Sequence, residues 1–155
     1  MNSPKRIIWI LSVLLITALV FFDASGSDAW ARPRMKVQVK TILASNGPKH
    51  VDPRLSANIR GLRSVFRYSS YKLLGNNRMT LGLGQTGKAV LPGRRTLHIT
   101  PLDVKNNRAR MRLTIFQKKR QTFQTVIQLR NRGTITVGGP KHQNGFLLFN
   151  ISNSF

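Results

Sequence analysis

Residues 108–129 decide the fold and read RARMRLTIFQKKRQTFQTVIQL. Apolar and polar side chains alternate with a period of two, which is typical of a β-strand with one face in a core and the other in water. The first half places Ala109, Met111, Leu113 and Ile115 on one side and Arg108, Arg110, Arg112 and Thr114 on the other. The second half places Phe123, Ile127 and Leu129 opposite Gln124 and Gln128, with Val126 as an exception. Because Lys118, Lys119 and Arg120 separate the halves, the stretch predicts a β-hairpin with one apolar and one cationic face.

Further runs with strand character follow one another along the chain, separated by turn residues. They are residues 35–44, 69–74, 78–83, 88–91, 95–104, 134–137 and 146–151, with turns at 76–77, 92–93, 106–107, 131–133 and 138–145. Together with the hairpin they make eight or nine short strands. The sequence therefore predicts a mainly β domain, an antiparallel β-sandwich or a partly open barrel.

One segment has the pattern of a helix. Asp52 offers an N-cap and Pro53 suits the first helical position. The apolar residues Leu55, Ile59, Leu62 and Phe66 then recur at helical spacing and form one stripe. Gly61 costs such a helix about 1 kcal/mol relative to alanine, so we expect the helix to depend on packing against the sheet.

The charge of the chain is strongly unbalanced. Among 155 residues there are 26 lysines and arginines against four acidic residues, a formal net charge of +22, and there is no cysteine. The absence of cysteine excludes disulfides and thiolate chemistry. A surface with this charge attracts anions.

The N-terminal residues have the three-part pattern of a secretory signal. Lys5 and Arg6 precede an apolar run over residues 7–22, and small residues follow, with Gly26 and Ala31 as the two candidate cleavage positions. Retention as a membrane anchor stays open beside cleavage at either position. We predict an export segment over residues 1–31, a single basic domain over 32–155, and a location in the periplasm or cell envelope of a bacterium.

Catalytic and cofactor signals are weak. Residues 82–88, GLGQTGK, match glycine-rich phosphate-binding patterns, but Pro92 and Gly93 follow where such a loop needs a helix, so we predict a loop between strands. After the export segment, few residues could act in acid-base catalysis, namely His50, His98, His142, Asp52 and Asp103, and the three histidines lie in separate segments. We therefore predict no enzyme activity, no catalytic residue, no metal site and no cofactor.

The C-terminal segment carries two short resemblances. Leu147, Phe149, Ile151 and Phe155 share one parity, which resembles the C-terminal signal strand of bacterial outer-membrane barrels over nine residues. Residues 133–139 are similar to a strand-turn segment of secretin pore domains. Asn153 and Pro140 break the two patterns, so neither assigns a family. They imply an alternative function, a small outer-membrane barrel or a secretion-pore accessory subunit that uses its C-terminal strand.

The basic residues carry the functional prediction. We expect a non-enzymatic envelope binding or assembly module whose cationic face contacts an anionic partner, either an envelope component such as a lipid head group or an acidic glycan, or an acidic protein. The predicted contact residues are Arg108, Arg110, Arg112, Lys118, Lys119 and Arg120. Contact with a membrane is compatible with this prediction. Specific nucleic-acid binding is not favoured, because only Tyr68 and Tyr71 offer aromatic rings among the charges.

Overall fold

The alternation in residues 108–129 produces two antiparallel strands, as predicted. A computed structural model describes residues 34–155 of the chain, and the predicted export segment lies outside them. In it, β6 (Arg108–Gln117) pairs with β7 (Arg120–Arg130) through a two-residue turn. The two remaining strands of this sheet are β5 (Arg95–Lys105) and β4 (Gly87–Leu91), so that a four-stranded sheet has the order β4-β5-β6-β7.

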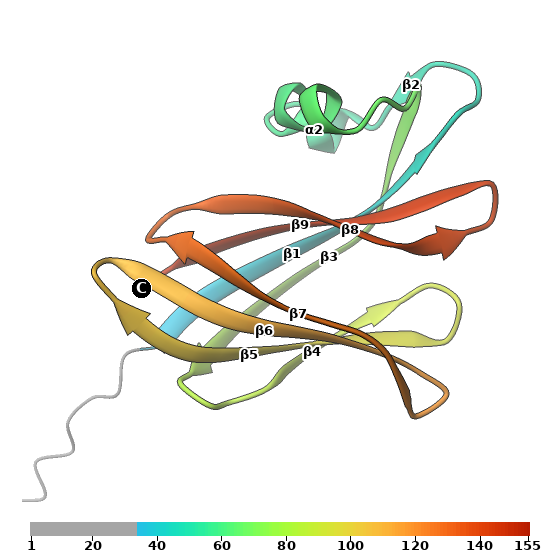
Figure 1. Ribbon diagram of the computed structural model, residues 1–155. Coiled ribbons are helices and arrows are strands. Elements are labelled where there is room, and N and C mark those ends of the chain that lie inside the picture. The colour runs from blue at the N-terminus through green and yellow to red at the C-terminus, as the bar shows by residue number, and fades with distance from the viewer. Residues whose placement is uncertain (1–33) are drawn as a thin grey trace, which may run out of the picture. The chain divides into compact units, whose positions relative to one another are not determined.

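A second sheet has five strands in the order β2-β3-β1-β9-β8. They are β1 (Arg34–Ser45), β2 (His50–Val51), β3 (Ser70–Gly82), β8 (Thr134–His142) and β9 (Gly145–Ser154). All neighbours in it are antiparallel except β2 and β3. The two sheets lie face to face as the layers of a sandwich (Figure 1). The predicted mainly β class is confirmed, and the sandwich is the alternative that applies.

The core lies between the two sheets and is built from the predicted alternation. Ala109, Met111, Leu113 and Ile115 of β6 are at most 1% exposed. They belong to one cluster with Met35, Val37 and Val39 of β1 and with Leu147, Phe149 and Ile151 of β9. Burial of apolar area at about 25 cal/mol per Å² is the main stabilising contribution. The shared parity of the C-terminal segment therefore reflects packing inside this domain.

Residues 34–155 contain one packed α-helix, as predicted. The helical segment, however, is not continuous over the apolar stripe. It consists of a 3-10 turn, η1 (Pro53–Leu55), and a separate α-helix, α2 (Ile59–Val65). Leu55 and Leu62 are both buried in a second cluster on the outer side of the five-stranded sheet. Between them, Lys40 Nζ donates to Asn58 Oδ1 at 2.8 Å and ties the chain to β1. The segment follows the sheet surface, and tertiary contacts outweigh the helical period of the sequence.

Two predicted turns are instead parts of longer strands. Asn76 and Asn77 lie within β3, which stays paired with β1 by means of a bulge near Thr41 and Ile42. Residues 138–140 lie within β8, which has a bulge opposite β9. A Cβ at Gly139 would lie only 2.5 Å from a ring carbon of Phe149. A side chain at position 139 would clash with the Phe149 ring, so glycine allows the two strands to pack closely here.

Candidate anion-binding surfaces

The outer face of the four-stranded sheet carries the three predicted arginines. Arg108, Arg110 and Arg112 are exposed, while the residues between them are buried. Arg108 stands opposite Lys105 of β5 and opposite Arg130 of β7. These three cations form one row across the sheet. Like charges directly opposite each other on neighbouring strands destabilise a sheet, by roughly 0.2–1 kcal/mol per pair.

Arg110 is the member of the predicted site whose charge is compensated. Its Nη1 lies 2.9 Å from Oδ2 of Asp103, the residue opposite it on β5. The two side chains are 50% and 27% exposed, so water screens the pair and its net contribution is small. Arg108 and Arg112 have no carboxylate partner among residues 34–155. They are therefore the better placed of the three to meet an external anion.

The structure places the other three predicted residues at the opposite end of β6. Lys118 and Lys119 form the β6–β7 turn, and Arg120 begins β7. Lys118 lies six positions after Arg112 along the strand, a distance of about 20 Å. The predicted set is thus two clusters on one hairpin, and both are exposed.

The backbone of the β6–β7 turn is unusual for its sequence. Lys118 and Lys119 both have positive φ, 48° and 67°. Tight hairpin turns of this kind favour asparagine or glycine, because other side chains are strained in the left-handed region. The β5–β6 turn follows that rule, since Asn106 and Asn107 have φ values of 49° and 58°. The two turns that flank β6 therefore both have two residues at positive φ, but one turn uses asparagines and the other uses lysines.

Arg94 joins the cations at the β6–β7 turn, although sequence reasoning did not include it. The β5–β6 ladder ends at the pair Arg95 and Gln117, so Arg94 and Lys118 are the next residues on each side. Arg94 is exposed and also has a positive φ, 56°. The sequence shows Arg94 as a basic residue after Pro92-Gly93. Only the pairing of β5 with β6 shows that it lies beside the β6–β7 turn. We call Arg94, Lys118, Lys119 and Arg120 the turn cluster.

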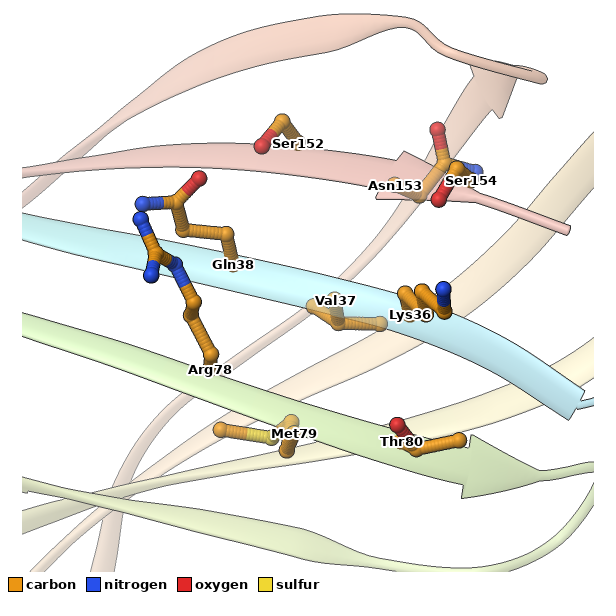
Figure 2. A pocket seen from close by; sticks show the side chains of 9 residues that line it. All are labelled: Lys36, Val37, Gln38, Arg78, Met79, Thr80, Ser152, Asn153 and Ser154. Atoms are coloured by element: carbon orange, nitrogen blue, oxygen red, sulfur yellow. The ribbon is translucent and has the colours of Figure 1, made fainter.

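A shallow trough lies on the outer face of the five-stranded sheet (Figure 2). Its cavity volume is about 370 Å³. Polar side chains from three strands line it, namely Lys36 and Gln38 of β1, Arg78 and Thr80 of β3, and Ser152 and Ser154 of β9. Lys36 stands opposite Thr80 on one side and Ser154 on the other. These donors and the two positive charges suit an anion, and sequence reasoning missed the trough because its strands are far apart in the chain.

Both acidic residues of the described chain are already paired. Asp52 accepts from the backbone N–H of Arg54 at 3.0 Å and from the Arg54 guanidinium at 2.7 Å. The hydrogen bonds from Arg54 hold the pKa of Asp52 well below its usual range. The predicted role of Asp52 as a cap is confirmed. With Asp103 bound to Arg110, both aspartate side chains of residues 34–155 are paired, and neither neutralises the remaining cations.

The residues considered for catalysis lie apart. His50 is on β2, His98 on the outer face of β5 and His142 at the end of β8. Burial, more than the nearby charge of Lys88, lowers the pKa of His98, whose ring lies 4.6 Å from that of Phe116. Residues 34–155 contain no group of three or more histidines and carboxylates that could hold a metal ion. The glycine-rich residues join β3 to β4, as predicted.

Two further features bear on the predicted partners. Tyr71 is fully buried and donates its hydroxyl hydrogen to the carbonyl of Phe66, so its ring is not available for stacking. The C-terminal strand β9 is hydrogen-bonded to β1 on one edge and to β8 on the other. Its backbone is therefore occupied within this sheet.

The part of the chain that the structure describes contains no helix long and apolar enough to cross a membrane. No protein-family model, no curated protein and no solved structure matches the chain.

Proposed function

We propose that this protein is an exported, non-enzymatic module of a bacterial cell envelope that docks a polyanion through the β6–β7 hairpin. The docking surface consists of the turn cluster and of the row of Lys105, Arg108 and Arg130 with Arg112 beside it. The export and envelope parts of the proposal rest on the N-terminal sequence. The docking part rests on the chemistry of the hairpin.

The observation that carries the proposal is the pair of lysines at positive φ. Left-handed backbone costs an ordinary residue roughly 1–2 kcal/mol, and Asn106 and Asn107 show that this fold uses asparagine for the same turn. Two adjacent like charges add repulsion at the tip. Strained residues persist where function requires them, and what Lys118 and Lys119 supply that asparagine and glycine cannot is positive charge.

The separation of the two clusters indicates the class of partner. A small anion contacts one cluster, whereas charges about 20 Å apart along β6 match a polymer or a membrane surface that repeats its negative charges. The charged residues lie on strand surface and turns, without an enclosing pocket over the row. Such a surface supports electrostatic attraction that is broad in specificity.

The test replaces the two turn lysines by the residues that tight hairpin turns favour. In the full-length chain, Lys118→Asn with Lys119→Gly should raise the free energy of unfolding by about 1 kcal/mol or more, since both residues tolerate positive φ. The same variant should bind heparin and phosphatidylglycerol vesicles more weakly. Calorimetry at about 0.1 M salt, where screening acts over about 10 Å, measures both affinities, and urea unfolding measures stability.

The matched control is Arg60→Gln with Arg63→Gln. These two residues are exposed on α2, away from the hairpin, and their replacement removes the same charge. We expect the control to retain more of the wild-type affinity than the turn variant does. Equal losses in the two variants would show that only total charge matters, and an unchanged affinity in the turn variant would refute the proposal.

A further inference from the structure

Arg95 differs from the other cations of the described chain because its side chain faces the interior. It has the same parity on β5 as the buried residues Leu97 and Ile99. Its cross-strand partner is Gln117, at the end of β6. Arg95 therefore lies between the two sheets, at the end of the sandwich that carries the turn cluster.

Part of the Arg95 guanidinium is buried without a hydrogen-bond partner. Its Nη1 atom is inaccessible, and no acceptor from residues 34–155 reaches it. The two aspartates of residues 34–155 are bound to Arg54 and Arg110. The space for the group depends on Gly93, because a Cβ there would lie 2.9 Å from Nη1. A buried hydrogen-bond donor without a partner is costly, and in a native structure it calls for an explanation.

Arg95 also lines a cleft between the sheets. The cleft has a volume of about 280 Å³. Its walls are mostly apolar and come from Ile115 and Phe123 of the hairpin and from Gly138, Gly139 and Pro140 of β8. Phe123 is 36% exposed. The hydroxyl of Thr122 already donates to the carbonyl of Ile115 at 3.2 Å, which leaves Arg95 and the Gln117 amide as donors toward a ligand.

We propose that this cleft binds an amphiphilic monocarboxylate, a fatty acid with a single short chain. Its carboxylate pairs with the Arg95 guanidinium, for which a planar two-oxygen acceptor is the best geometric match. Its chain lies against Ile115, Phe123 and Pro140. The volume is just below the range of about 300–1,000 Å³ that is typical of small-molecule sites, so a single chain fits it better than a two-chain lipid. This site is separate from the proposed polyanion surface, which uses outward-facing cations.

The test uses octanoate with two matched probes. Acetate has the charge without the chain, and 1-octanol has the chain without the charge. In titrations of the full-length chain followed by amide and methyl NMR, octanoate should give saturable shifts at Ile115, Phe123 and residues 138–139. Acetate and 1-octanol should each bind roughly tenfold more weakly or worse, because each lacks one of the two contacts.

Neighbouring arginines supply the matched variants. Arg95→Gln should lower octanoate affinity roughly tenfold or more, whereas Arg94→Gln, which removes the same charge from an exposed position, should leave it nearly unchanged. Lys118→Asn with Lys119→Gly should also retain octanoate binding, so failure of this site and failure of the polyanion proposal are distinguishable.

Stability gives a second readout. Without octanoate, Arg95→Met should raise Tm, because an apolar side chain of similar size removes the buried, unpaired donor. Adding octanoate should raise the Tm of the wild type and not that of Arg95→Met. Equal octanoate affinity in the wild type and in Arg95→Gln, equal binding of octanoate and acetate, or a lower Tm for ligand-free Arg95→Met would each overturn the proposal.

Discussion

The two outer faces of the sandwich are both cationic, but they are assembled in different ways. On the four-stranded sheet, three arginines of one strand alternate with core residues, and all three are exposed. On the five-stranded sheet, η1 and α2 cover one part of the face over Leu55 and Leu62. The uncovered part holds the trough with Lys36 and Arg78, which come from different strands. The face of the four-stranded sheet thus presents arginines from one strand, whereas the face of the five-stranded sheet has a concave site lined by several strands.

Charged residues on the faces of a β-sandwich differ in how strongly they indicate a function. Alternation within a strand only shows which side chains avoid the core, and it is expected on any wet face. Charges that oppose each other across strands, or that occupy strained turn positions, carry a cost. The row of Lys105, Arg108 and Arg130 and the pair Lys118 and Lys119 belong to that second kind, so they are stronger functional evidence than the number of arginines.

The largest expected effect comes from breaking the core beneath both faces. Leu113 is 1% exposed and its neighbour Arg112 is exposed on the same strand. Leu113→Asp removes core packing and buries a charge, so we expect a loss of about 4 kcal/mol or more and an unfolded domain. Arg112→Asp should change stability by no more than about 0.5 kcal/mol. Circular dichroism and urea unfolding decide this, and equal losses would contradict the assigned parity of β6.

The second prediction separates the contributions of the faces to polyanion binding. Arg108→Gln with Arg112→Gln should lower the affinity for anionic vesicles by about tenfold or more, since each basic residue near such a surface contributes about 1 kcal/mol. Lys36→Gln with Arg78→Gln should have a smaller effect. The quadruple variant should show the product of the two factors within about twofold, because the sites lie on opposite faces.

Vesicle binding at several salt concentrations measures these factors. A larger loss in the Lys36 and Arg78 variant would reverse the assignment and make the trough the main anionic site.

The third prediction concerns the segment that covers part of one face. The pKa of Asp52 is held below its ordinary value of 3.8, mainly by its hydrogen bonds with Arg54. The carboxylate form therefore stabilises the fold above that pH, and the contribution is lost as the pH falls. Between about pH 5 and about pH 3, unfolding of the wild type in urea should become easier more steeply than unfolding of Asp52→Asn. Parallel pH profiles would show that this pair contributes nothing to the fold.

The smallest effect is on the open face, at His98. Burial lowers the pKa of this histidine below 6.5, and the charge of Lys88 lowers it further. Lys88 stands directly opposite His98 on β4. Lys88→Gln should shift the pKa upward only part of the way, because the larger cause remains. Histidine NMR titration measures the shift, and a full return to the ordinary value would show that charge outweighs burial here.

The sequence allows most of the fold to be predicted and less of the sites. The core face of β6 follows from the period of two, because burial selects apolar side chains at every second position. The turns at 76–77 and 138–140 were predicted wrongly, because local turn preference is outweighed by pairing with β1 and β9 over longer distances in the chain. The helix was divided for the same reason, since Asn58 is bound to Lys40 of β1.

The sites show the same limit. Arg108, Arg110 and Arg112 are predictable as outward-facing residues, because one strand contains all three. The pairing of Arg110 with Asp103 requires the register of β5 and β6. The trough requires the strand order of the five-stranded sheet, and the inward direction of Arg95 requires the limits of β5. None of these relations is local, and a pattern in one segment does not contain them.

The position of β9 has a consequence for how the protein is made. Of the described strands, β9 comes last in the chain, yet it lies inside its sheet between β1 and β8, and nearly the whole described chain separates Lys36 from its partner Ser154. Such long-range pairing makes folding slow. The five-stranded sheet cannot be completed until residues 145–154 have left the ribosome, so a growing chain that lacks them stays incompletely folded. A chain truncated before Gly145 would leave β1 and β8 with open edges, which promote aggregation.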